Sequence, residues 1–377
     1  MTFLPPVKSL RRSPEPSHGG GPESTLGGAR RDAAILITGA GGEMGHGLLE
    51  SLDAERRERK AAGESFPAVI AIDLRELPSE HRALCDESFT GDVCDEKMLE
   101  RLLASYQIGS IYHLAALLST RSEFVPEIAH GVNVGGTLNL LRIAAEEAAN
   151  NGRPVQFFFP SSIAAYGLPD LATKTKTGAV GEDQFLQPHT MYGCNKVTGE
   201  NLGNYYAHHY RKLASDRMEF PVDFRSIRFP GIISADTVPS GGTSDYGPEM
   251  LHAAARGDAY ACFVRKDARI PFMTMPEAIH AIRKMMAAPK RQLSRTVYNV
   301  QSFNPSAAEF LDEVRTHFEH AETTFEPDLA RQSIIDSWPA SCCDAAARKD
   351  WGWSPTYDLS TAFSEYLVPR IRARYAE

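Results

Sequence analysis

The chain has 377 residues, 42% of them hydrophobic and 23% charged, which is the balance of an ordinary globular protein. Its formal net charge of −8 does not favour binding to nucleic acid or to anionic lipid. No apolar run is long enough to cross a bilayer, and the 12 histidines and six cysteines show no metal-ligand spacing. We therefore predict no nucleic-acid partner, no membrane segment and no metal site.

The first 31 residues differ in composition from the remainder of the chain. They contain five prolines and the run Gly19-Gly20-Gly21, a composition that cannot bury a core, so we expect 1–31 to be a disordered leader. Five basic residues stand against two acidic ones, which favours an organelle transit peptide. A terminal segment without a targeting signal stays open as the alternative, because the prolines oppose the amphipathic helix that transit peptides usually form.

From residue 33 onward, short apolar runs alternate with helical patterns. Strands are predicted at 33–38, 69–73, 110–115 and 155–160, and helices at about 43–59 and 136–150. This alternation predicts an α/β fold: a Rossmann-type doubly wound parallel sheet with helices on both faces. We expect the segments after Ala54 and from Arg211 to Met218 to be surface loops. Residues 263–275 are expected to be extended.

A glycine-rich turn follows the first predicted strand, at Thr38-Gly39-Ala40-Gly41-Gly42-Glu43-Met44-Gly45. Gly39, Gly42 and Gly45 stand three apart, directly after a strand and at the start of a helix. Residues without a Cβ allow such a tight turn, and they let backbone N–H groups and the positive end of the helix approach a pyrophosphate. The turn therefore predicts a dinucleotide site.

Asp73 closes the second strand, where an acid accepts hydrogen bonds from the adenosine ribose and repels a 2′-phosphate. We therefore expect the cofactor to be NAD rather than NADP, although Arg75 could meet such a phosphate. The other predicted cofactor contacts lie at the glycine turn and at the ends of later strands: Glu43, Met44, Leu74, Arg75, Asp92, Val93, Leu114, Ala115, Ala116 and Ile232.

The alternation of strands and helices becomes less regular after Ser215, where the predicted loops are longer and glycines interrupt the pattern. We expect an NAD-binding Rossmann domain over 32–235. Residues 236–377 are expected to form a smaller C-terminal substrate-binding lobe, interleaved with the last Rossmann elements.

The segment from Met191 to Glu200 places Tyr192 and Lys196 four residues apart, on one face of a predicted helix. Oxidising a secondary alcohol by hydride transfer requires a base for the hydroxyl proton. A free tyrosine has a pKa of about 10, and a nearby ammonium lowers that pKa by favouring the phenolate. We therefore predict Tyr192 as the base, with Lys196 as its partner and as a contact to the nicotinamide ribose.

Three hydroxyl side chains are predicted to face the substrate. Ser162 follows the strand predicted at 155–160, at the sheet edge where ligands bind, and is expected to hydrogen-bond the substrate hydroxyl. A helix cap is the alternative role for Ser162. Ser119 and Thr243 are the other candidates, and Thr243 lies in a glycine-rich segment that suits a lid.

Taken together, these motifs resemble the extended short-chain dehydrogenases/reductases, with the glycine turn, His113-Leu114-Ala115-Ala116 and the Tyr192/Lys196 pair as the main points of likeness. A second group of motifs resembles the L-threonine 3-dehydrogenases of that superfamily: 228–234, 241–246, 336–339 and 350–353. The resemblance implies oxidation of L-threonine to 2-amino-3-ketobutyrate with NAD, with Ser119, Ser162, Tyr192 and Thr243 as substrate contacts. It also implies a homodimer and, for a eukaryotic member, a mitochondrial location; the cytoplasm is the alternative.

Two other functions remain open at this point. A nucleotide-sugar epimerase would use the same scaffold and would need a basic pocket, for which Arg256, Arg265, Lys266 and Arg269 are candidates. A non-catalytic dinucleotide sensor is disfavoured because such proteins often lack the base pair, whereas Tyr192 and Lys196 are both present.

Overall fold

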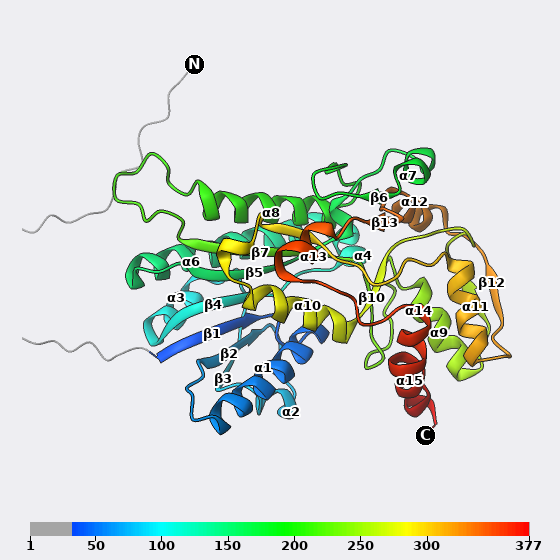
Figure 1. Ribbon diagram of the computed structural model, residues 1–377, viewed down its shortest axis with the longest axis horizontal. Helices are drawn as coiled ribbons and strands as arrows, with labels where there is room; N and C mark the ends of the chain where they lie inside the picture. The colour runs from blue at the N-terminus through cyan, green and yellow to red at the C-terminus, as the bar shows by residue number, and fades with distance from the viewer. Residues whose placement is uncertain (1–31, 377) are drawn as a thin grey trace, which may run out of the picture. The chain divides into compact units, whose positions relative to one another are not determined.

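A seven-stranded parallel sheet forms the centre of the computed structural model, which describes residues 32–376 (Figure 1). The strand order is β11-β7-β5-β4-β1-β2-β3, so the chain reverses direction across the sheet between β1 and β4. That reversal is the place where open α/β sheets bind ligands. The strands of this sheet are β1 (Asp32–Thr38), β2 (Ala68–Asp73), β3 (Glu87–Thr90), β4 (Tyr106–His113), β5 (Val155–Ser162), β7 (Val222–Phe229) and β11 (Val297–Asn299).

Six short strands pair outside the central sheet, as β10-β8, β12-β9 and β13-β6. Their bounds are β6 (Ala179–Val180), β8 (Gly231–Ile233), β9 (Tyr260–Cys262), β10 (Phe272–Thr274), β12 (Thr323–Phe325) and β13 (Ser341–Cys342). The longer helices are α1 (Glu43–Ala61), α3 (Glu96–Ser105), α6 (Thr137–Asn151), α8 (Met191–His208), α9 (Tyr246–Arg256), α10 (Met275–Ala287), α11 (Ala307–His317), α12 (Leu329–Ser337) and α15 (Val368–Tyr375).

Short helical segments connect these elements: α2 (Ser79–Arg82), α4 (Ser119–Phe124), α5 (Pro126–His130), α7 (Leu171–Thr177), α13 (Ala345–Trp351) and α14 (Leu359–Thr361). Two π-helical segments, η1 (Gly131–Gly136) and η4 (Ala362–Leu367), and two 3-10 turns, η2 (Ile163–Ala165) and η3 (Lys290–Gln292), complete the described part of the chain.

Helices cover both faces of the sheet (Figure 1). On one face, Leu48 and Leu49 of α1 pack with Ile282 of α10 against the sheet. On the other face, Leu140 and Leu141 of α6 occupy the equivalent position. Because both faces are covered, β1 and β2 carry continuous apolar runs rather than alternating ones, as expected for a parallel sheet.

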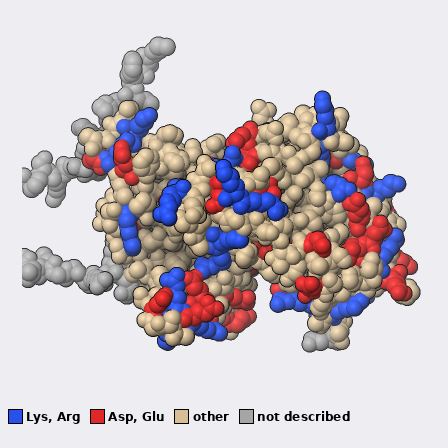
Figure 2. Space-filling view, in the orientation of Figure 1, with Lys and Arg blue, Asp and Glu red and all other residues tan. Residues whose placement is uncertain are grey.

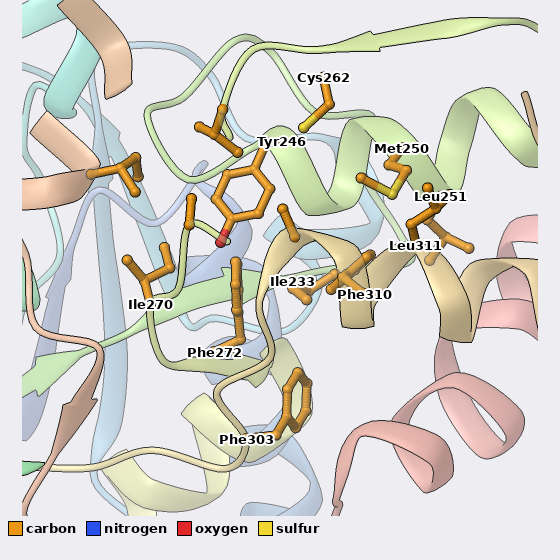
Figure 3. Packing of buried hydrophobic residues seen from close by; sticks show 14 of the residues in the cluster. Ile233, Tyr246, Met250, Leu251, Cys262, Ile270, Phe272, Phe303, Phe310 and Leu311 are labelled. Carbon is orange, nitrogen blue, oxygen red and sulfur yellow. The ribbon is translucent and has the colours of Figure 1, made fainter. Parts of the chain in front are cut away.

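A third core lies in the part of the chain that follows β7. Tyr246 at the start of α9 packs there with Phe272 of β10 and Phe310 of α11 (Figure 3). The ring contacts in this core join residues that are far apart in the sequence, because Phe272 contacts both Tyr246 and Phe310.

The predicted fold class is confirmed, whereas two local predictions are wrong. The residues after Ala54 are not a loop, because α1 continues unbroken to Ala61. Ion pairs of Asp53 with Arg56 and Arg57, three and four residues on, stabilise this extension. Within 263–275, only Phe272–Thr274 is a strand, and Arg265 to Ala268 form a turn.

The remaining expectations about organisation stay predictions. The leader at 1–31 lies outside the described residues. The division at 235/236 is not tested, although β11 from the second half joins the edge of the central sheet. Among residues 32–376, no helix combines the length and the apolar character that a bilayer crossing requires.

The glycine turn allows a test of its tight geometry. Gly39 has φ +69°, and a Cβ on it would lie 2.5 Å from the backbone nitrogen of Ala115. Gly63 has a similar φ of +76°, but a Cβ there would meet nothing within 4 Å. We expect Gly63→Ala to cost about 1–2 kcal/mol in free energy of unfolding, the cost of a left-handed backbone. Gly39→Ala is expected to cost clearly more.

Urea unfolding of both variants measures the difference. Equal losses would show that β4 moves away from the turn without cost, and would contradict a rigid approach of β4 to the turn.

Candidate active site

The glycine turn leaves an open cradle at the start of α1. A Cβ on Gly45 would lie 2.5 Å from the carbonyl oxygen of Ala40, so the helix meets the turn without room for a side chain. Gly42 is the N-cap residue and carries no side chain to occupy the first N–H groups of the helix. Free N–H groups at the positive end of a helix bind anions, so the cradle fits the pyrophosphate of a dinucleotide.

Asp73 lies at the end of β2 and closes this turn. One carboxylate oxygen accepts a hydrogen bond from the backbone N–H of Gly41 at 2.9 Å, and the other accepts from the backbone N–H of Arg75 at 3.1 Å. The carboxylate is half-buried, while the side chains of Leu74 and Arg75 are exposed. Asp73 therefore sits beside the cradle, where an adenosine ribose acceptor is predicted.

The remaining predicted cofactor residues follow the ends of neighbouring strands. The carboxylate of Asp92, just after β3, accepts from the backbone N–H of Cys94 at 2.9 Å. Val93 is buried, and a Cβ on Gly136 would lie 2.6 Å from its side chain. Leu114, Ala115 and Ala116 follow β4, Met44 lies in the first turn of α1, and Ile232 lies in β8; all five are half-buried.

The buried His113, which we did not predict as a site residue, connects β1, β4 and the start of α6 by hydrogen bonds. Thr137 donates its hydroxyl proton to the carbonyl of Asn133 at 2.6 Å, so it can only accept from Nε2 of His113, at 3.0 Å. Nδ1 of His113 then accepts from the hydroxyl of Thr38 at 2.8 Å. Burial lowers the pKa of His113 to about 3, so it stays neutral and fixes β4 against the last residue of β1.

Tyr192 and Lys196 lie one turn apart near the start of α8, as predicted. A Cβ on Gly193 would lie 2.1 Å from the carbonyl oxygen of Ala164, so the helix start touches the segment that follows β5. The ammonium of Lys196 is 5.2 Å from the centroid of the Tyr192 ring and 4.8 Å from that of Phe159. It donates to the carbonyl of Pro160 at 2.6 Å.

Burial acts on the acidity of both groups, and the role of Lys196 in stabilising the Tyr192 phenolate stays a prediction. Burial raises the pKa of Tyr192 above its ordinary value of 10.0, and burial lowers the pKa of Lys196 to about 7 against the pull of Glu200. The physical reason is that both groups leave water together, while the ammonium bonds to a carbonyl instead of the phenol. Removal of solvent therefore outweighs their mutual attraction.

A buried ion pair behind this helix was also missed. Glu200, one turn beyond Lys196, accepts from two nitrogens of Arg228 at 2.8 and 2.6 Å. Arg228 also donates to the hydroxyl of Tyr166 at 2.9 Å. The pair joins α8 to β7 and so fixes the face that carries Tyr192. The i, i+4 spacing of Lys196 and Glu200 was a visible signal, but the partner 28 residues on was not.

The three predicted substrate hydroxyls have different partners in the structure. Ser162 ends β5, and its side chain accepts from the N–H of Ala164 at 3.1 Å, so it caps the η2 turn as the alternative reading allowed. The hydroxyl of Thr243 donates to that of Ser119 at 3.3 Å, although the two residues are 124 positions apart. The side-chain amide of Asn133 accepts from the backbone N–H of Leu117 at 2.8 Å and donates to the backbone carbonyl of Leu117 at 3.0 Å. These two bonds fix the segment before Ser119.

Comparison with known proteins agrees with this geometry. The model of the "NAD dependent epimerase/dehydratase family" matches residues 35–300. The chain belongs to this family. Its cofactor is accordingly NAD, as predicted, and the superfamily resemblance is confirmed.

Individual relatives are more specific. The mitochondrial L-threonine 3-dehydrogenase of Bos taurus is 35% identical over 325 residues, which cover 86% of this chain and 79% of the relative. The solved L-threonine dehydrogenase of Clostridium difficile is 32% identical, covers 92% of this chain and 100% of its own, and has a TM-score of 0.77. A monomeric L-threonine 3-dehydrogenase of metagenomic origin is 35% identical, covers 90% and 99%, and has a TM-score of 0.75.

Glu43 brings an acidic group next to the anion cradle, in the first turn of α1. Its Oε1 atom is enclosed and has no hydrogen-bond partner within the described part of the chain. Burial raises the pKa of Glu43 from its ordinary value of 4.5. The hydroxyls of Ser234 and Thr237 oppose this rise, whereas the charges of Asp236 and Asp245 add to it.

This raised pKa makes stability depend on pH. The folded protein binds the Glu43 proton more tightly than the unfolded chain, so stability falls as pH rises above 4.5 through the folded pKa. Glu43→Gln cannot ionise, and we expect it to be more stable relative to the wild type at pH 8 than at pH 4. Urea unfolding at both pH values measures this, with the exposed Glu58→Gln on the same helix as control. Parallel pH curves for Glu43→Gln and the wild type would refute it.

Proposed function

We propose that the protein is an NAD-dependent L-threonine 3-dehydrogenase that oxidises L-threonine to 2-amino-3-ketobutyrate. The observation that carries the proposal is the Tyr192/Lys196 pair of α8, which contacts the end of β5. It occurs together with a dinucleotide cradle after β1, in a chain that is 32–35% identical to several L-threonine 3-dehydrogenases over most of its length. The cradle residues Gly39, Gly42 and Gly45 would hold the pyrophosphate, and Asp73 the adenosine ribose.

The residues of the chain divide the chemistry between them. Bound NAD supplies the hydride acceptor. Tyr192 takes the proton of the threonine hydroxyl as the hydride leaves the threonine Cβ, so the alcohol loses one hydride and one proton. Tyr192 must first lose its own proton, and the protonated form of Lys196 is the nearby group that stabilises the phenolate. Ser162, Ser119 and Thr243 would orient the substrate by hydrogen bonds.

The epimerase alternative needs free cations in the second half of the chain, and the structure pairs the three candidate arginines with carboxylates. Of these candidates, only the exposed Lys266 has no ion pair among the described residues. Arg256 bonds to Asp258 at 2.6 Å, Arg265 to Asp336 at 2.8 Å and Arg269 to Glu309 at 2.8 Å. Figure 2 shows basic and acidic side chains intermixed over this part of the face that it draws. These arginines therefore do not support a diphosphate pocket.

Substitution of the proposed base tests the mechanism. We expect Tyr192→Phe to lower kcat by at least about a hundredfold, the contribution of a positioned acid or base, and to leave NAD affinity unchanged. NAD reduction with L-threonine measures turnover, and calorimetry measures binding. Tyr205→Phe, an exposed tyrosine on the same helix, should behave as the wild type. Near-normal turnover of Tyr192→Phe would exclude this base, and interconversion of UDP-sugars without net NADH would favour an epimerase.

We also propose that the protein is a homodimer, joined through α4 and α5. Phe124 and Ile128 expose 80% and 62% of their surface there, a large apolar area for a face in water. The metagenomic relative is described as monomeric, so the assembly of this chain has to be measured.

The expected result is a dimer that Phe124→Glu converts to a monomer, measured by light scattering. The matched control is Leu213→Glu, because Leu213 is fully exposed elsewhere and should leave the dimer intact. A monomeric wild type would end the proposal.

A mitochondrial location remains a proposal as well. It is supported by the basic composition of 1–31 and by the mitochondrial Bos taurus relative, and imaging of the full chain with a C-terminal fluorescent tag would decide between mitochondrion and cytoplasm.

A further inference from the structure

The segment between β8 and α9 forms a loop over the proposed substrate site. The chain leaves the core after buried Ala235, runs through exposed residues at 236–238, and returns at Thr243, which is 5% exposed. Gly241 turns the chain with φ +88°. The carboxylate of Asp245 accepts from the backbone N–H groups of Gly242 and Ser240 at 2.6 and 3.2 Å. These bonds within the loop stabilise the turn.

Side chains from two different helices hold the two carbonyls at the tip of this loop. Thr120 of α4 donates its hydroxyl to the carbonyl of Gly241 at 3.0 Å. Arg331 of α12 donates to the carbonyl of Gly242 at 2.9 Å, and the same nitrogen lies 3.4 Å from that of Gly241. These bonds attach the loop to two elements that are otherwise remote in sequence.

The bonds lie next to the proposed substrate contacts. Thr120 directly follows Ser119, and Gly242 directly precedes Thr243. The hydroxyls of Ser119 and Thr243 are 3.3 Å apart, so the attachment of the loop tip determines how closely these two groups approach. A shift of the tip of about 1 Å would disturb both contacts, and misplacements of that size are costly in positioned reactions.

Arg331 is itself fixed in a manner that suits this task. Its guanidinium carbon lies 3.2 Å from the centroid of the buried Phe263 ring, which orients the planar group. Within residues 32–376 no carboxylate forms an ion pair with it. Its backbone N–H is capped by Asp328 at the start of α12. Its charge is thus directed at backbone carbonyls of the loop, where a charged donor makes the stronger kind of hydrogen bond.

We infer that Arg331 is a positioning residue for the dehydrogenase reaction: by holding the carbonyls at Gly241 and Gly242, it keeps Thr243 in register with Ser119 for the substrate. This inference rests on the proposed function only in that Ser119 and Thr243 contact L-threonine. Arg331 reaches the substrate through the loop and does not touch the reacting atoms.

Two variants at this position separate charge from geometry. Arg331→Gln removes the charge and the planar guanidinium group. Arg331→Lys keeps the charge, but its ammonium is not planar and cannot stack on the Phe263 ring in the same way. We expect Arg331→Gln to raise KM for L-threonine about tenfold to a hundredfold, the loss of a charged hydrogen bond, with a smaller change in kcat and none in NAD affinity. Arg331→Lys is expected to lie between Arg331→Gln and the wild type.

Hydrogen exchange read by mass spectrometry, without any substrate, gives an independent measurement. The amides of 238–244 should exchange faster in Arg331→Gln by about tenfold or more, because the loop tip loses one of the two side chains that hold its carbonyls. Thr120→Val removes the other attachment with little change in shape and should also speed exchange in this segment. Arg315→Gln, an exposed arginine on α11, is the control and should change neither exchange nor KM.

The outcomes separate this inference from the proposed function. Unchanged exchange at 238–244 in both Arg331→Gln and Thr120→Val overturns the positioning role, whatever the substrate is. Failure of the wild type to oxidise L-threonine would refute the proposed function, while the exchange measurement would still decide the role of Arg331. A Thr120→Val protein with wild-type melting temperature keeps the test valid if Arg331→Gln folds poorly.

Discussion

The burial of one ammonium group constrains the whole site. Lys196 is only 3% exposed, and the desolvation of a charge is expensive unless other groups replace water. The Pro160 carbonyl and the rings of Phe159 and Tyr192 supply that replacement, so α8 must lie against the end of β5 at one register. The position of Tyr192 follows from this requirement, and so does the side of the sheet on which a substrate can bind.

The features that could be predicted from the sequence depend on short-range patterns. The glycine turn and the pair at Tyr192 and Lys196 each lie within about ten residues, and the helix α1 follows the turn directly, so each of these features is a local pattern in the sequence. The parallel sheet was also visible, because apolar strands of this kind alternate with helices. The helix predicted over about 43–59 ends at Ala61, whereas the expectation of a surface loop after Ala54 is wrong, because the charges of this segment have helical spacing.

The features that could not be predicted are pairings across long distances in the chain and effects of burial. Nothing in the local sequence joins Glu200 to Arg228, His113 to Thr137, or Arg331 to Gly242. The acidity of Tyr192 depends on how much water the folded chain removes from it, and proximity to Lys196 says little about that. Sequence reasoning therefore proposes the reacting groups, but it does not give the electrostatic balance around them.

The loop at 236–242 is also bound at its first residue. Asp236 pairs with Arg370 of α15 at 2.8 Å, and Arg374 of the same helix donates to the Asp236 carbonyl. The N–H of Ala235 donates to the hydroxyl of Tyr366 at 3.2 Å. Protein engineers who transplant this loop between homologues to change the accepted amino acid would therefore obtain a mismatched chimera unless α12 and α15 are transplanted together with it.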